Sequence, residues 1–289
     1  MKDVLYDLLD LLKLEKIEEN IFRGRSQDLG FGNVYGGQVL GQGLSAASQT
    51  VHESRSAHSL HAYFLRPGDA NLPIVYEVDP VRDGKSFTTR RVKAVQKGSA
   101  ILTLEVSFQV FEEGFDHQIE MPEVPGPDGI QPELERLRGL AGKIPPHLRD
   151  KLLYDKPIEF RHVNPVNPFA PEKRKAVRYS WFKTIHKMPD DISVHRYLLA
   201  YASDYGFVGT SLYPHGHTFW EPGMQVASLD HAMWFHRDFR LDDWLLYVMD
   251  SPSASFARGL NRGSIYTMDG RLVASTIQEG LIRYHEFRK

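Results

Sequence analysis

Tyr63-Phe64-Leu65-Arg66 is followed ten residues later by Tyr76, and Trp234-Phe235-His236-Arg237 is followed ten residues later by Tyr247. A second pair of motifs keeps the same register. Ser86-Phe87 precedes Gln109 by 22 residues, counted from the Phe, and Ser255-Phe256 precedes Gln278 by the same 22. Equal offsets predict a duplicated unit, so a residue that only one copy has is a candidate for function rather than for fold.

The composition excludes several classes of protein. The 289 residues are enough for two units of ordinary domain size, each with its own core. With 35 basic and 37 acidic residues, the chain has no bulk charge for binding nucleic acid. It has no cysteine, so disulfides, Cys-rich metal sites and a thiol nucleophile are all excluded. No apolar run approaches the roughly 18 residues of a membrane span, so we expect a soluble protein that does not bind membranes.

The first residues, 1–14, predict an amphipathic helix rather than a targeting signal. Leucines recur at helical spacing, and Asp3, Asp7 and Asp10 interrupt them. A signal peptide would instead begin with positive charge and continue with an uninterrupted apolar segment. We therefore expect this helix to be part of the folded protein.

Each half of the chain predicts one helix followed by an antiparallel sheet. In the first half, Gly36-Gly37-Gln38 opens a helical stretch of small residues that reaches Thr50, and strands follow from Ser59. Turn signals at Arg82-Asp83-Gly84 and Lys97-Gly98 separate strands expected at 74–78, 86–95 and 100–110. This order is typical of the α+β class rather than of alternating βαβ units.

Prolines crowd residues 112–172, which we expect to be a linker with some helix inside it. The predicted domains are therefore 1–111, 112–172 and 173–289. In the last of these the order recurs, with a strand near 177–183, a helix near 193–206 and an Asp269-Gly270 hairpin turn. The remaining strands are expected at 225–236, 244–250, 254–266 and 272–283.

An acidic side chain interrupts the apolar face of the second-half helix. This face carries Tyr197, Leu198, Tyr201 and Tyr205, and Asp204 falls three residues after Tyr201. The spacing predicts a carboxylate on or beside the buried stripe. A buried ionised acid is costly unless it is hydrogen-bonded, so we expect either a partner or a raised pKa. The ordinary alternative is an acid that caps a neighbouring backbone group.

A hydroxyl and a carboxylate are present only in the second copy. When the copies are aligned on Phe64 and Phe235, Ala57 lies opposite Ser228. The first-half helix likewise has no acid before Glu53. If Asp204 and Ser228 meet, the second copy therefore holds a site that the first has lost. The ordinary alternative for Ser228 is a polar residue at a strand end.

Gln278 is a third polar candidate, on a face of the last strand that it shares with Ala274, Thr276 and Gly280. An amide on so small and uncharged a face needs hydrogen-bond partners. Gln109 occupies the matching place in the first copy of the alignment, which leaves open that the fold itself requires a glutamine there.

The three side chains together would suit hydrolysis by direct attack of water. Asp204 can accept a proton, whereas Ser228 and Gln278 can each donate and accept hydrogen bonds, so the three could hold one water against a carbonyl. A Ser228 nucleophile with His231 as its base is the alternative, which ranks lower because the chain lacks a G-x-S-x-G motif.

Two further groups of residues are weaker candidates. His215-Gly216-His217 could ligate a metal ion, but no further ligands stand at metal-binding spacing, so we expect loop histidines and no metal site. Lys85, Arg90 and Arg91 could bind the phosphates of a substrate, although basic residues that alternate along a strand usually form its solvated face.

Several motifs closely resemble those of the acyl-CoA thioesterase II family, and the likeness runs from Leu11 to about Arg283. They are Val34-Tyr35-Gly36-Gly37-Gln38, Tyr63-Phe64-Leu65-Arg66-Pro67-Gly68, Ser86-Phe87 through Arg90-Arg91-Val92, Leu229-Asp230-His231 through Met233-Trp234-Phe235-His236, and Ser275-Thr276-Ile277-Gln278-Glu279-Gly280. The resemblance implies a double hotdog fold, in which each unit is a helix wrapped by an antiparallel sheet and the two sheets join edge to edge.

The resemblance also implies hydrolysis of acyl-CoA thioesters to free fatty acid and CoA, without a cofactor. The family's Asp, Ser or Thr, and Gln fall on Asp204, Ser228 and Gln278, the residues that the repeat comparison selects. Bacterial members often have Thr where this chain has Ser228. Both side chains carry a hydroxyl, so Ser228 can make the same hydrogen bonds. The family further implies a cytoplasmic homo-oligomer, often a tetramer.

Two rival functions stay open at the level of sequence. A hotdog enoyl-CoA hydratase would carry an Asp with a His five residues later, but Gly209 stands five residues after Asp204. A non-catalytic acyl-CoA binding protein is the other rival. Loss of the enoyl absorbance of crotonyl-CoA would identify a hydratase, and thiol release from a saturated acyl-CoA separates an enzyme from a binding protein.

Overall fold

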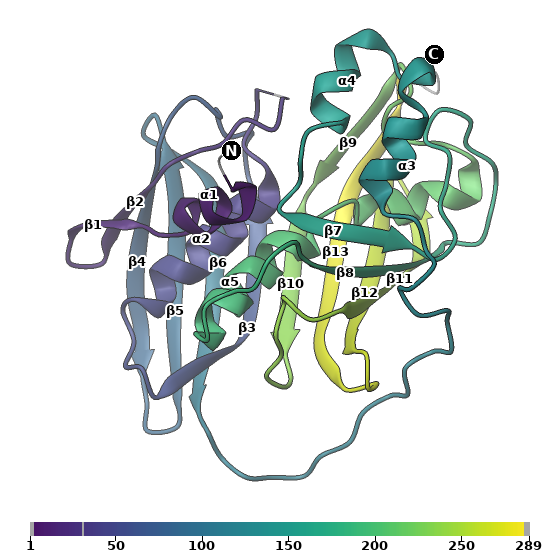
Figure 1. Ribbon diagram of the computed structural model, residues 1–289. Helices are drawn as coiled ribbons and strands as arrows, with labels where there is room; N and C mark the ends of the chain where they lie inside the picture. The colour runs from purple at the N-terminus through teal and green to yellow at the C-terminus, as the bar shows by residue number, and fades with distance from the viewer. Residues whose placement is uncertain (1–2, 31, 286–289) are drawn as a thin grey trace.

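The computed structural model describes residues 3–30 and 32–285. Its strands form one antiparallel sheet of 13 strands, with the order β1-β2-β4-β5-β6-β3-β10-β13-β12-β11-β8-β7 and with β9 paired to β13. Figure 1 shows this sheet as two curved units, the first-half strands on the left and the second-half strands on the right, with α2 and α5 side by side in front.

The elements of the first half follow the expected order of a helix and then strands. The helix α2 carries small residues on the side that faces α5, and the strands alternate buried and exposed side chains as a half-buried sheet requires. The elements are α1 (Val4–Leu11), β1 (Glu15–Glu18), β2 (Ile21–Gly24), α2 (Gly36–Ser48), β3 (Arg55–Phe64), β4 (Ile74–Asp83), β5 (Phe87–Gln96) and β6 (Ser99–Val110).

The second half repeats this order after a segment with its own short helices. In Figure 1 this segment first runs as a long loop beneath the molecule and then rises along the second-half strands, with α3 and α4 at the top right. The elements are α3 (Glu133–Gly139), the 3₁₀ turn η1 (Ala141–Lys143), α4 (Pro146–Leu152), β7 (Ile158–His162), β8 (Val177–Thr184), α5 (Ile192–Ser203), the 3₁₀ segment η2 (Val208–His215), β9 (Met224–Ser228), β10 (Asp230–Phe235), β11 (Leu245–Ser255), β12 (Arg258–Thr267) and β13 (Leu272–Tyr284).

The two halves join through their sheets and through their helices. The strands β3 and β10 pair edge to edge, with Leu60 opposite Met233. Glycines bring α2 against α5, because a Cβ at Gly37 would lie 2.2 Å from the carbonyl oxygen of Tyr201. The fold therefore requires glycine at this position, and the N-terminus of α2 meets the C-terminus of α5.

Two sequence expectations change in the structure. The strand expected at 225–236 is two strands, because β9 and β10 part at Leu229, where the carboxylate of Asp230 accepts the backbone N–H of Glu279 at 2.7 Å. The segment 112–172 is more than a linker, since β7 lies within it and pairs with β8 in the second-half sheet.

The sequence alignment of Gln109 with Gln278 is wrong. In the first half Arg90 pairs with Val106, whereas the corresponding inward-facing pair in the second half is Asn261 and Gln278. Gln109 instead lies on the opposite face of its strand and bonds to Glu112. Val106 therefore matches Gln278, and it lies three residues before Gln109. A shift by an odd number of residues moves a side chain to the other face of the strand, so the fold does not require a glutamine in the first copy.

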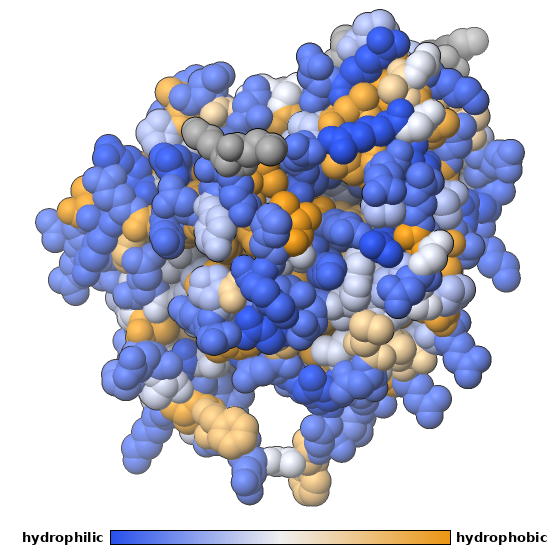
Figure 2. All heavy atoms as spheres, in the orientation of Figure 1, coloured by the Kyte–Doolittle hydropathy of each residue, from blue (hydrophilic) through white to orange (hydrophobic). Residues whose placement is uncertain are grey.

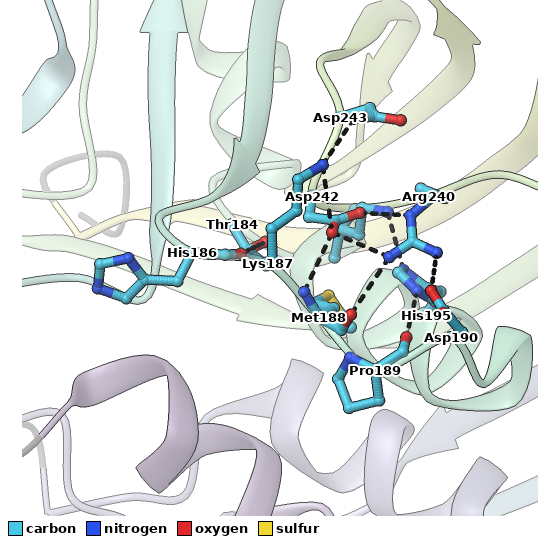
Figure 3. A network of polar contacts seen from close by, with 11 residues as sticks. Thr184, His186, Lys187, Met188, Pro189, Asp190, His195, Arg240, Asp242 and Asp243 are labelled. Atoms are coloured by element: carbon cyan, nitrogen blue, oxygen red, sulfur yellow. Dashed lines mark hydrogen bonds and ion pairs between the residues drawn. The ribbon is translucent and has the colours of Figure 1, made fainter.

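A network of polar contacts fixes the loop that leads into α5 (Figure 3). The buried carboxylate of Asp242 accepts the backbone N–H of Met188 at 3.0 Å and two hydrogen bonds from Arg240. The ring of His195, in the first turns of α5, bonds to the carbonyl oxygen of Pro189 and to the backbone N–H of Leu241. These contacts fix the start of α5 against the loop that carries Asp242.

One continuous apolar core lies between the helices and both halves of the sheet. Hydrophilic residues predominate on the face shown in Figure 2, and hydrophobic ones show between them where α3 and α4 lie. Within residues 3–30 and 32–285, no helix is both long enough and apolar enough to cross a membrane.

Candidate active site

Asp204 is the C-terminal cap residue of α5, at the point where that helix meets the N-terminus of α2. Its Oδ1 accepts a hydrogen bond of 2.6 Å from Nε2 of Gln278 and one of 3.3 Å from the hydroxyl of Ser228. The backbone N–H of Gly37 also donates to this carboxylate. The three polar residues selected from the sequence therefore meet, and the first half of the chain supplies a fourth group.

Neighbouring strands place the hydroxyl and the amide. Ser228 ends β9 and lies opposite Gly280 of β13, two residues beyond Gln278 on the same face of that strand. Gly280 leaves room for η2, because a Cβ there would lie 2.5 Å from Val208. The small, uncharged face of β13 therefore exists because η2 packs directly on it, and this packing buries Gln278 completely.

Burial raises the pKa of Asp204 to about 6, against the opposing effect of its hydrogen bonds from Gln278, Ser228 and Gly37. Desolvation disfavours the charged form, whereas each donor favours it. A carboxylate with this pKa is ionised at neutral pH and is a stronger base than an ordinary aspartate, as a general base requires.

A cavity of about 430 Å³ adjoins these residues, and Asp204 and Ser228 lie in its wall. Gly36, the first residue of α2, also lines it. Its lining includes apolar side chains such as Leu212 and Phe219, and the segment between the two halves contributes charged side chains. The cavity is thus large enough for part of a substrate, with the carboxylate of Asp204 at its wall.

A charged cluster that the sequence analysis missed forms part of this wall. Lys156 Nζ lies 3.1 Å from Glu133 Oε2 and 2.7 Å from the hydroxyl of Tyr205, the residue after Asp204. The ring of His162 bonds to Glu133 as well, and burial lowers the pKa of His162 to about 4, so the ring is neutral. The members of this cluster come from separate segments, and three of them, Glu133, Lys156 and His162, lie inside the expected linker, so no spacing in the sequence marks them.

The three residues expected to bind phosphates, Lys85, Arg90 and Arg91, lie away from the cavity beside Asp204. Arg90 is buried, and its guanidinium bonds to Asp83, Arg82 and Thr50. Arg91 is exposed on the first-half sheet and pairs with Glu105. Lys85 is exposed beyond the end of β4. None of the three lines the cavity beside Asp204, because Arg90 and Arg91 belong to β5 and Lys85 to the turn between β4 and β5, in the far part of the first-half sheet.

The histidines do not form the alternative sites. Nε2 of His231 bonds to the hydroxyl of Ser203 at 3.0 Å, and burial lowers the pKa of His231 to about 3, so this ring is not a base for Ser228. His217 pairs with Glu221. Within the described part of the chain, no three His, Asp or Glu side chains gather as metal ligands would.

Comparison with known proteins decides the family. Residues 25–109 match the model of the acyl-CoA thioesterase N-terminal domain, and residues 148–281 match that of acyl-CoA thioesterase. Acyl-CoA thioesterase 2 of Haemophilus influenzae is 48% identical over 286 residues, which cover 99% of this chain and 100% of that protein. The chain belongs to the acyl-CoA thioesterase family.

Solved structures give the same result for the fold. The acyl-CoA thioesterase II TesB2 of Mycobacterium marinum matches with a TM-score of 0.78 at 41% identity, over 96% of this chain and 98% of that chain. A hotdog-fold protein of Alicyclobacillus acidocaldarius matches with a TM-score of 0.76 at 20% identity, over 96% of this chain and 98% of that chain. The expected α+β double hotdog is confirmed. The family match and the similar thioesterases show that the chain is a thioester hydrolase.

Proposed function

We propose that the protein hydrolyses acyl-CoA thioesters by direct attack of a water molecule, with Asp204 as general base. The observation that carries this proposal is the carboxylate of Asp204 on the wall of a cavity, with Gln278 and Ser228 both donating to its Oδ1. The shared contact holds the carboxylate in one orientation, which a general base requires.

Ser228 and Gln278 each keep hydrogen-bonding capacity for the water. The hydroxyl oxygen of Ser228 can accept while its proton points to Asp204. Oε1 of Gln278 is buried and has no partner among the described residues, so it can accept an O–H of the water. In this scheme Asp204 takes the other proton as the water oxygen attacks the thioester carbonyl.

The N-terminus of α2 is suited to stabilise the negative charge that develops on the carbonyl oxygen. Its cap residue, Tyr35, makes no side-chain cap, and the N–H of Gly37 is engaged by Asp204. The N–H of Gly36 has no partner among the described residues, and Gly36 lines the cavity. We assign Gly36 N–H as an oxyanion donor, because helix N-termini carry positive potential.

The geometry favours this scheme over a covalent one. His231 bonds to Ser203, so within the described residues Ser228 lacks the imidazole base that an acyl-enzyme route needs. The enoyl-CoA hydratase alternative is disfavoured too, since Gly209 stands at the cavity wall five residues after Asp204, where that reaction needs a His.

Thiol release from saturated acyl-CoA substrates tests the proposal. Wild-type protein should release CoA, whereas Asp204→Asn should lose at least a hundredfold in rate. Asp243→Asn, which removes an exposed acid outside the cavity, is the matched control and should keep full activity. Full activity in Asp204→Asn, a burst of thiol that signals an acyl-enzyme, or binding without release would each overturn the mechanism.

We further propose that the protein acts in the cytoplasm as a homo-oligomer, and we expect a tetramer. Size-exclusion chromatography with light scattering checks the oligomer, and a monomer at micromolar concentration would contradict it. The site described above is complete within one chain, so the chemistry does not depend on this assembly.

A further inference from the structure

Two tyrosine hydroxyls bind the end of α5 that carries Asp204. The hydroxyl of Tyr35, the N-terminal cap residue of α2, donates to the carbonyl oxygen of Tyr201 at 3.0 Å. The hydroxyl of Tyr247, on β11, donates to the carbonyl oxygen of Ser203 at 3.0 Å. One tyrosine comes from each half of the chain, so the two halves hold this helix end between them.

The two tyrosines complete the hydrogen bonding at the C-terminus of α5. The last four carbonyl groups of an α-helix have no partner within the helix, and in α5 they belong to residues 200–203. The hydroxyl of Ser203 donates to the carbonyl of Ala200, and the backbone N–H of Tyr205 donates to that of Ala202. The other two carbonyls of this turn are the acceptors of the tyrosine hydroxyls.

For a carboxylate, the C-terminus of α5 is the unfavourable end of the helix. Its carbonyl oxygens create a negative potential that disfavours a neighbouring anion, and Asp204 is the cap residue there. A hydroxyl that donates to such an oxygen offsets part of this potential. The same bonds fix the last turn of α5, from which the side chain of Asp204 reaches Nε2 of Gln278 at 2.6 Å. Loss of either hydroxyl would therefore loosen the carboxylate and disfavour its charged form.

The fold holds the hydroxyl of Tyr247 at one point. The side chain is buried, and its ring packs against that of Phe207. Gly263, on the next strand, makes room for the ring, because a Cβ there would lie 2.3 Å from it. The hydroxyls of Tyr247 and Thr276 are 2.8 Å apart. Since the carbonyl of Ser203 can only accept, Tyr247 gives it its single proton and accepts the proton of Thr276.

The internal duplication separates the ring of Tyr247 from its hydroxyl. Tyr76, on β4, occupies the matching place in the first copy, and its side chain is equally buried. The hydroxyl of Tyr76 donates to Oε1 of Gln42, in the middle of α2, at 2.7 Å. Both copies thus use the ring in their core, but the bond to a carbonyl at a helix end belongs to the copy that carries Asp204.

We propose that Tyr35 and Tyr247 are positioning residues for hydrolysis, which hold the terminal carbonyls of α5 and, through them, the carboxylate of Asp204. These roles rest on the proposed function, in which Asp204 is the general base. The two hydroxyls act on the reaction only through Asp204, and neither transfers a proton to the substrate.

The other charged and titratable groups near Asp204 bind elsewhere. They are Arg178 on β8, His162 on β7, His231 on β10, Tyr205 after α5, and the ion pair of Glu133 with Lys156. Within residues 3–30 and 32–285, none of their side chains donates to the carbonyls of Tyr201 or Ser203. Burial lowers the pKa of His162 to about 4 and that of His231 to about 3, so both rings stay neutral between pH 5 and 8.

Phenylalanine variants remove each hydroxyl and keep each ring. In Tyr247→Phe and in Tyr35→Phe, kcat for octanoyl-CoA should fall by roughly ten- to hundredfold with KM nearly unchanged, because the base is misplaced while the cavity is intact. The acidic limb of the pH profile should move to higher pH by roughly half a unit to one unit, because the charged form of Asp204 loses support.

Tyr76→Phe is the matched control, since it removes an equally buried hydroxyl from the same place in the first copy. It should leave kcat and the acidic limb unchanged. A loss of folded protein lowers the rate of a sample but does not move its acidic limb. A limb that stays in place in Tyr247→Phe or in Tyr35→Phe overturns the role of that tyrosine, and an equal shift in Tyr76→Phe overturns both roles.

A second test needs no turnover. Asp204→Asn is introduced into wild type and into Tyr247→Phe, and the stability of all four proteins is measured by urea unfolding at pH 8 and pH 4. The gain from Asp204→Asn at pH 8, less the gain at pH 4, reports how far folding raises the pKa of Asp204. This difference should be larger in the Tyr247→Phe background, and an equal or smaller one overturns the role of Tyr247.

The two tests also separate the positioning roles from the proposed function. If wild-type protein releases no thiol from octanoyl-CoA, the proposed function fails. If wild type releases thiol but neither the acidic limb nor the stability difference changes in Tyr247→Phe, hydrolysis stands and the positioning role of Tyr247 fails.

Discussion

The amide nitrogen of Gln278 lies 2.6 Å from Oδ1 of Asp204, although 74 residues separate the two in the chain. This hydrogen bond opposes the desolvation that otherwise raises the pKa of Asp204. The amide thus acts on the carboxylate in two ways, since it fixes the orientation of the group and favours its ionised form.

The pH dependence of hydrolysis follows from this balance. A general base must be ionised, and the pKa of Asp204 is raised to about 6. We expect kcat/KM to be constant above pH 7 and to fall about tenfold for each pH unit below about 6. Initial rates across this pH range check the prediction, and a flat profile down to pH 4 would contradict it.

Removal of the amide should shift this profile. Gln278→Met keeps the length of the side chain but loses the donor to Asp204, so the pKa of the acid should rise above about 6 and the acidic limb should move to higher pH. The plateau rate should also fall by about ten- to a thousandfold, as for loss of other oriented groups. Gln109→Met, on the outer face of the first-half sheet, is the matched control and should change neither quantity.

Asp204 should reduce stability where it is ionised. Its pKa is higher in the folded state than the usual value near 4, so the folded protein binds more protons between about pH 4 and 6. Stability from this group therefore falls as pH rises through that window. The free energy of unfolding of Asp204→Asn, measured by urea denaturation at pH 8, should exceed that of wild type by on the order of 1–3 kcal/mol. This gain should shrink at pH 4. A variant less stable than wild type at pH 8 would refute this account.

Gly37→Ala should disrupt the packing of α2 against α5. The added Cβ would lie 2.2 Å from the carbonyl oxygen of Tyr201, so α2 and α5 would have to separate. We expect a loss of about 3 kcal/mol or more in the free energy of unfolding, measured by urea denaturation. Gly139→Ala, where nothing lies within 4 Å of the new methyl group, should stay within about 1 kcal/mol of wild type. Equal stability of the two variants would mean that α2 and α5 do not pack as closely as described.

Asp242 should stabilise the protein in a pH-dependent way. Its carboxylate is buried, and hydrogen bonds from Arg240 and from the backbone of Met188 lower its pKa to about 2 (Figure 3). A depressed pKa gives stability that is present above about pH 4 and is lost as pH falls toward 2. Asp242→Ala should cost about 1–3 kcal/mol at pH 7, because it leaves the Met188 N–H without its acceptor and removes one of the two carboxylates that pair with Arg240.

Urea unfolding at two pH values checks this prediction. The difference between wild type and Asp242→Ala should be smaller at pH 3 than at pH 7. Asp243→Asn is the neighbouring control, since that side chain is exposed and pairs with the exposed Lys187. A cost that does not change with pH would show that Asp242 acts through packing rather than through charge.

The sequence predicts most elements of the fold because their patterns are local. Alternation of apolar and polar residues marks the strands, and the small residues after Gly36 mark a helix that packs closely on a neighbour. The break at Leu229 was missed, because it depends on the side chain of Asp230 bonding to the backbone of another strand. No local pattern contains such a contact.

The duplicated pattern located Asp204 and Ser228 through their absence from the first copy. For Gln278 the same comparison gave the wrong partner, because strand register depends on hairpin length, and the mismatch of three residues, an odd number, reverses the face. The basic residues Lys85, Arg90 and Arg91 matched a general expectation about phosphates, but which side of the sheet faces the cavity is decided only when both halves are assembled.

The sequence by itself determined the class of fold, the duplication and the identity of the three polar side chains, because periodicity and internal comparison are properties of the chain. Only the tertiary structure decided that Gly37 of the first half holds Asp204, and that Glu133, Lys156 and Arg178 form one wall of its cavity. These groups come from different strands, helices and loops, and their proximity results from the packing of two sheets and two helices, which no spacing along the chain encodes.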